Sequence, residues 1–110
     1  MDRMINEDVN NSPIVQLVNN MLEQAVRQRA SDIHIEALEK KVRIRYRIDG
    51  ALFERITYNI KLLPAIVARL KVIGGMDISE KRKPQDGRIT TFVDNREYDI
   101  RVSILPTVYG

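Results

Sequence analysis

The spacing of the apolar residues changes from a helical to a strand period early in this chain, and the change limits the folds open to it. From Ile14 to Val26 the apolar side chains recur at steps of three and four, which places them on one face of an α-helix. From Ile33 to Ile48 they recur at every second position, which is typical of strands with one buried face. A helix stripe and a sheet face bury their apolar sides by packing together, so the pattern predicts an α+β domain.

Turn and cap residues extend this prediction to the whole chain. Ser12 can cap a helix and Pro13 fits its first turn, while Asp49-Gly50 and the residue pair 94–95 are signals for tight turns. The sheet is expected to be antiparallel, with the helices packed on one face. The expected elements are a helix over about 13–29, strands over about 32–36, 42–48 and 51–57, a helix over 61–73, and a hairpin of strands 88–93 and 96–103.

Composition limits the class of function. The 110 residues suffice for one domain, and the absence of cysteine excludes a disulfide scaffold and a thiolate zinc site. With His34 as the one histidine, a metal site would have to be built mostly from carboxylates, and none is expected. Residues 1–40 carry four basic and seven acidic groups, whereas residues 41–110 carry fourteen basic and eight acidic groups. The basic second part favours an anionic partner.

The sequence contains no motif that would make the chain an enzyme by itself. It has no G-x-x-x-x-G-K-[ST] phosphate loop, no G-x-G-x-x-G fingerprint and no H-E-x-x-H helix. None of the four serines has a histidine placed by the sequence to activate it. We therefore expect no catalytic residue in this chain.

The last hairpin contains the candidate binding residues. A two-residue turn at 94–95 would set Arg88 opposite Arg101, with Asp99 on the same surface. Two guanidinium groups directly opposite each other repel, and a phosphate between them would remove the repulsion because each group offers a planar donor fork. Gly87 would let backbone amides approach the same anion. Asp99 could instead neutralise both arginines locally, and this interpretation stays open.

A second basic row supports a rival function. Arg43, Arg45 and Arg47 alternate along one predicted strand and could follow the backbone of a nucleic acid, as in a small basic nucleic-acid-binding module. The row lacks interleaved exposed aromatic residues, and the hairpin register sets Glu36 opposite Arg43 and Asp32 opposite Arg47. Ion pairs across the sheet are therefore favoured.

Five strings occur together in one order and spacing: Ser12-Pro13-Ile14-Val15, residues 29–36 (RASDIHIE), residues 42–50 (VRIRYRIDG), residues 84–89 (PQDGRI) and residues 99–103 (DIRVS). Together they closely resemble the secretion ATPase family, hexameric motors of type II secretion and type IV pilus assembly. The resemblance covers about residues 12–110 and implies a PAS-like N-terminal domain. Residues 1–11 are mostly polar and show no apolar period, so they are expected to be a flexible lead-in or linker. A RecA-like ATPase domain, with its Walker and histidine motifs, would follow beyond Gly110.

The resemblance also implies a role for the hairpin. In the family, this domain packs against the ATPase domain and directs arginines toward the nucleotide phosphates, and these match Arg88 and Arg101, with Gly87 and Asp99 as supporting residues. The implied function is a regulatory, nucleotide-sensing domain that needs no cofactor itself, in a full-length protein that uses ATP and Mg²⁺. The PQDGR string favours the assembly and secretion motors over the retraction motor.

The same resemblance sets expectations about partners and location. The full-length protein would form a homo-hexamer and contact inner-membrane platform components, from the cytoplasm and at the membrane face. Neither nucleic-acid binding nor direct membrane insertion is expected. A third interpretation, a free-standing PAS-like sensor, would require a ligand-sized apolar pocket between helix and sheet.

Overall fold

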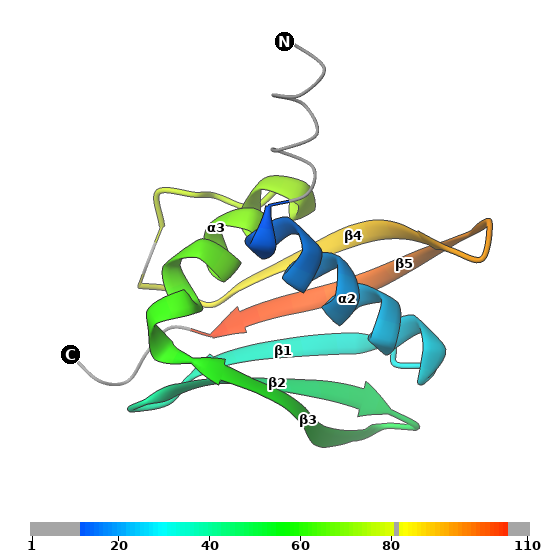
Figure 1. Cartoon of the computed structure of the whole chain (residues 1–110), viewed down its shortest axis with the longest axis horizontal. Coiled ribbons are helices and arrows are strands. Elements are labelled where there is room, and N and C mark those ends of the chain that lie inside the picture. The colour runs from blue at the N-terminus through cyan, green and yellow to red at the C-terminus, as the bar shows by residue number, and fades with distance from the viewer. Residues whose placement is uncertain (1–11, 81, 106–110) are drawn as a thin grey trace, which may run out of the picture.

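A computed structural model describes residues 12–80 and 82–105. The five strands form one sheet in the order β3-β2-β1-β5-β4, and both helices cover the same face of it (Figure 1). The α+β class is therefore confirmed, whereas the expectation for residues 1–11 lies outside the described residues. In chain order the elements are α2 (Pro13–Arg27), β1 (Asp32–Ala37), β2 (Lys41–Ile48), β3 (Ala51–Asn59), the 3-10 helix η1 (Ile60–Leu62), α3 (Leu63–Gly74), β4 (Gln85–Val93) and β5 (Arg96–Leu105).

The sheet is mixed, so the expectation of a wholly antiparallel sheet was wrong. β1 and β5 run parallel, with Asp32 beside Arg101, while the other neighbouring strands are antiparallel. After β3 the chain crosses the helix-covered face through α3, and the β4–β5 hairpin then adds to the sheet with β5 against β1 (Figure 1). Parallel neighbours need such a crossover connection, which local alternation in the sequence does not encode.

The first hairpin has the predicted register and ion pairs. Glu36 lies opposite Arg43, and Asp32 lies opposite Arg47. An Arg43 Nη2 atom lies 2.8 Å from Glu36 Oε2, and Arg47 Nε lies 3.6 Å from Asp32 Oδ2. These carboxylates and guanidinium groups lie on the sheet face opposite the helices, because their strand neighbours are the buried apolar residues.

The core lies between the helices and the sheet. On α2 the predicted apolar stripe is buried, and Tyr46 Oη of β2 donates a hydrogen bond of 2.8 Å to the carbonyl oxygen of Met21. On α3 the helix begins later than predicted, because Ile60–Leu62 form a 3-10 turn. The fully buried large side chains are Tyr46, Met21, Ile33, Ile35, Ile44, Ile66, Leu70, Ile100, Val18, Val42 and Val102. The helix side of the sheet is thus filled, and the opposite side carries the polar residues.

Candidate functional site

The predicted arginines meet on the uncovered face of the sheet. Arg88 of β4 and Arg101 of β5 lie directly opposite each other, as the turn residues predicted. They line a hollow of about 270 Å³ together with Asp99, Ser31 and Asp32. We call these five residues the arginine hollow. The structure therefore brings together three of the four predicted site residues and adds two that the sequence analysis did not select.

Asp32 is the buried centre of the arginine hollow. Its Oδ1 atom accepts a hydrogen bond of 2.5 Å from Arg101 Nε, and its Oδ2 atom accepts one of 2.7 Å from the Ser31 hydroxyl. Arg47 Nε lies 3.6 Å from the same Oδ2 atom. Burial raises the pKa of Asp32. The hydrogen bonds from Ser31 and Arg101 and the charges of the two arginines lower it by more, so the pKa lies below its ordinary value. Asp32 is therefore a carboxylate at neutral pH.

Arg88 and Asp99 have different surroundings. Asp99 Oδ1 accepts a hydrogen bond of 2.8 Å from the Thr90 hydroxyl, and Asp99 forms no ion pair within the described residues. Arg88 is exposed and has no hydrogen-bond or ion-pair partner in the part of the chain that the structure describes. Asp99 therefore does not neutralise the two arginines, and the ion pair of Arg101 is made by Asp32 instead.

Gly87 lies next to Arg88 in the chain but faces the helices. A Cβ atom at this position would lie 2.7 Å from Met76 Cε and 2.9 Å from the carbonyl oxygen of Gly74. The absence of a side chain lets β4 approach the end of α3, so glycine is required here for packing. A contact between the Gly87 amide and an anion stays a prediction.

The residues that precede Arg88 stabilise the segment between α3 and β4. Gln85 Nε2 donates to the carbonyl oxygens of Asp77 (2.9 Å) and Glu80 (3.1 Å), and Gln85 Oε1 accepts from the Asp77 amide (2.8 Å). Asp86 Oδ1 accepts from the Ser103 hydroxyl of β5 (2.5 Å). The PQDGR string is thus a local scaffold whose last residue alone points its charge into the arginine hollow.

The other basic row is neutralised across the sheet. Arg43 lies near both Glu36 and Glu54, and Arg45 also contacts Glu36. His34 lies opposite Arg45, and burial together with the positive charges of Arg47 and Arg45 lowers its pKa. Within residues 12–80 and 82–105, no group of His, Cys, Asp or Glu could hold a metal ion. No helix in the same part of the chain is long and apolar enough to span a membrane.

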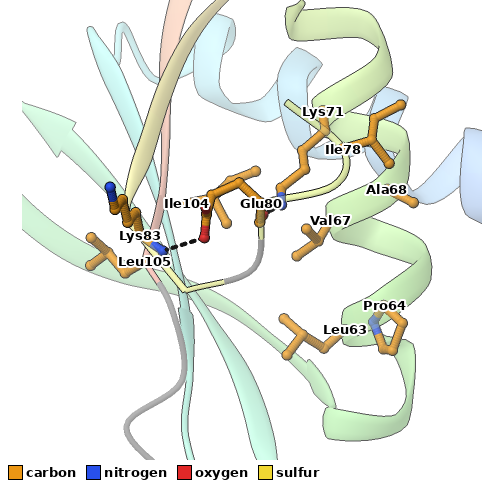
Figure 2. A pocket seen from close by; sticks show the side chains of 10 residues that line it. All are labelled: Leu63, Pro64, Val67, Ala68, Lys71, Ile78, Glu80, Lys83, Ile104 and Leu105. Carbon is orange, nitrogen blue, oxygen red and sulfur yellow. Dashed lines mark hydrogen bonds between the residues drawn. The ribbon is translucent and has the colours of Figure 1, made fainter. Parts of the chain in front are cut away.

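A separate apolar pocket lies at the other end of the sheet (Figure 2). It has a volume of about 410 Å³ and lies between α3, the segment that precedes β4, and the end of β5. Lys71 of α3 is buried in its wall and donates from Nζ to the carbonyl oxygen of Glu80. Its lining residues are Leu63, Pro64, Val67, Ala68, Lys71, Ile78, Glu80, Lys83, Ile104 and Leu105.

Asp32 and Ser31 were missed for a topological reason. Both lie in the RASDIH string, but the strand order was needed to set β1 beside β5 and Asp32 beside Arg101. The charge pattern alone directed Asp32 toward Arg47 only, which is its antiparallel partner. The RASDIH string marked Ser31 and Asp32 as part of the family resemblance. No local sequence pattern indicated that Asp32 would pair with a residue of β5.

Comparisons with known proteins show the family to which the chain belongs. The sequence profile of the family described as type II/IV secretion system protein matches residues 7–110. The chain is 50% identical over 99 residues to type II secretion system protein E of Aeromonas hydrophila and 46% identical over 104 residues to type II secretion system ATPase E of Vibrio cholerae. It is 49% identical over 100 residues to type IV pilus assembly ATPase PilB of Myxococcus xanthus. These matches cover 90%, 94% and 90% of this chain but 20%, 21% and 18% of the relatives, so the chain spans about a fifth of their length.

Proposed function

Because the chain belongs to the type II/IV secretion system protein family, we propose that it is the domain ahead of the ATPase domain in a secretion or pilus-assembly motor. In that position it supplies Arg88 and Arg101 to the phosphates of ATP. Two of the relatives are named as ATPases, which supports ATP as the nucleotide. The PAS-like assignment, the hexamer and the platform partners at the inner-membrane face belong to the same proposal.

One observation carries the proposal. Two arginines lie opposite each other on neighbouring strands, on the exposed side of the sheet, where their charges repel. Asp32 pairs with Arg101, but within the described residues no carboxylate pairs with Arg88, although Asp99 lines the same hollow. A phosphate group brings the missing negative charge and enough acceptor oxygens for both donor forks. The donor set is cationic, which suits phosphate oxygens, and Mg²⁺ is not assigned to this chain. When it accompanies ATP, Mg²⁺ adds positive charge at the phosphate oxygens.

The implied mechanism is electrostatic. Arg88 and Arg101 stabilise negative charge that develops on the phosphoryl group during transfer, and they lose a ligand when the terminal phosphate leaves. The domain then changes its position relative to the ATPase domain, and this movement reaches the partners of the motor. Nucleotide sensing and catalytic support are thus two consequences of the same contact.

The proposal is tested by substitution in the longer protein that contains this domain. Arg88→Ala or Arg101→Ala should lower the rate of ATP hydrolysis at least about tenfold, which is the low end for a charge-stabilising group. Arg55→Ala is the matched control, because Arg55 lies over the Phe53 ring on β3 and outside the arginine hollow. Full activity in both arginine variants would contradict the proposed contact.

The apolar pocket favours a second candidate, a ligand sensor. Its volume of about 410 Å³ lies within the usual range for small-molecule sites, and it is lined mainly by aliphatic side chains. Native mass spectrometry of the purified chain tests this candidate. A bound small molecule that is lost on Val67→Trp would support it, and a ligand-free mass under conditions that keep the fold would count against it.

A further inference from the structure

The two arginines of the hollow are held in different ways. Arg88 is unpaired within the described residues, whereas Arg101 is fixed by Asp32, which is 4% exposed. The Arg101 side chain is 58% exposed, although its Nε atom reaches a buried carboxylate. Arg101 is therefore anchored near its stem and open at its tip.

The guanidinium group of Arg101 has two edges that can bind an anion, and the nitrogen that donates to Asp32 determines which edge stays free. Asp32 accepts from Nε, and no hydrogen bond within the described residues uses Nη1 or Nη2 of Arg101. The end-on edge formed by these two nitrogens is the one that matches two oxygens of a phosphate. A carboxylate that took both terminal nitrogens would occupy this edge, and an anion could no longer bind end-on.

Asp32 is itself fixed, which makes it a rigid support. Its second oxygen is occupied by the Ser31 hydroxyl and lies near Arg47. Its neighbours come from β2 on one side and β5 on the other, so the carboxylate links both strands that flank β1. Residues whose own position is fixed by such supporting contacts hold a binding geometry more closely than mobile side chains do.

We infer that Asp32 is a positioning residue that binds Arg101 through Nε and thereby presents its terminal nitrogens to a phosphate group. This inference rests on the proposed function, since it concerns the same arginine. The inference predicts that loss of the Asp32 charge weakens phosphate binding, which is the opposite of what net charge alone predicts. A carboxylate in the hollow repels an anion, so its removal would strengthen phosphate binding if only charge mattered.

A phosphate titration of the 110-residue chain tests the inference. The probe is inorganic tripolyphosphate, which has the charge of the ATP phosphates without the base, and the readout is the amide and arginine Nε–H signals in NMR at constant ionic strength. Asp32→Asn, which keeps size and removes charge, should weaken binding about threefold or more. Asp94→Asn is the matched control, because it removes a carboxylate charge that pairs with Arg27 outside the arginine hollow, and it should leave binding unchanged.

Arg101→Lys supplies a second arm that does not depend on the fold of the Asp32 variant. Lysine keeps the charge and lacks the fork, so the inference predicts weakening close to that of Arg101→Ala. Equal or tighter binding by Asp32→Asn, or binding by Arg101→Lys equal to that of the unmodified chain, would overturn the inference. Two results would contradict the proposed phosphate contact itself. One is that Arg88→Ala and Arg101→Ala bind tripolyphosphate like the unmodified chain, and the other is that the unmodified chain does not bind it.

Discussion

At the scale of single residues, Asp32 has the most unusual surroundings in the arginine hollow. It is nearly inaccessible, yet it stays ionised because Ser31, Arg101 and Arg47 surround its two oxygens. Burial alone would favour the neutral acid, and the donors reverse this preference. The folded chain therefore stabilises the carboxylate form of Asp32 more than the unfolded chain does, and this difference makes the free energy of unfolding depend on pH.

Asp32→Asn should lower the free energy of unfolding at pH 7 by about 1–3 kcal/mol, because charged hydrogen bonds to Arg101 are lost. Since the folded pKa is depressed, this contribution is fully present above the unfolded pKa of about 3.9 and disappears as the pH falls through the folded value. Denaturant unfolding of both proteins between pH 7 and pH 2 measures it. A stability difference that stays constant over this range would contradict the assignment.

At the scale of elements, the position of β4 depends on its close approach to the end of α3. Gly87 and Gly74 meet at this point, and Met76 covers both. The α3 helix ends at Gly74, and the capping residue Gly75 has a φ of 67° that lets the chain turn toward this contact. The approach fixes the strand that bears Arg88, so packing on one face of the sheet determines the charge geometry on the other.

Gly87→Ala should destabilise the chain by about 1–3 kcal/mol, because the added methyl group meets the Gly74 carbonyl oxygen as well as the Met76 side chain. Thr90→Ser is the control, since it lies on the exposed face of the same strand, keeps the hydroxyl that donates to Asp99 and should cost about 0.5 kcal/mol or less. Thermal unfolding of the three proteins gives the comparison. Equal stability of Gly87→Ala and the unmodified chain would show that the contact is not tight.

The elements also show which parts of the fold are encoded locally. The registers of the β1–β2 and β4–β5 hairpins are the predicted ones, and Asp94 and Asn95 have the positive φ values of 52° and 65° that a tight turn requires. These registers place Arg88, Arg101 and Asp99 together, so most of the candidate site could be predicted. The parallel contact between β1 and β5 depends on a crossover through α3, and Asp32 and Ser31 could not be predicted without it.

At the scale of the whole molecule, the charges on the uncovered sheet face divide into two regions. The arginines of β2 are matched by carboxylates of β1 and β3, whereas Arg88 has no such partner among the described residues. A long nucleic-acid backbone would need the β2 row, and a single phosphate group needs the arginine hollow alone. The distribution therefore favours a compact anion.

This distribution makes a prediction for the rival function. At about 0.15 M salt the chain should bind single-stranded DNA more weakly than the micromolar range, because the row on β2 is already paired. Fluorescence anisotropy over a series of salt concentrations measures the affinity and its salt slope. Micromolar binding with a steep slope would support a nucleic-acid-binding module instead.

The central claim is tested most directly by the distance from each arginine to a bound nucleotide. In a structure of the longer motor with a non-hydrolysable ATP analogue, the terminal nitrogens of Arg88 and Arg101 should lie about 2.7–3.2 Å from phosphate oxygens. Both guanidinium groups should approach the same nucleotide from the sheet face that the helices leave open. Arginine tips that stay beyond about 6 Å from every phosphate in all subunits, or that pair with other carboxylates, would contradict the account.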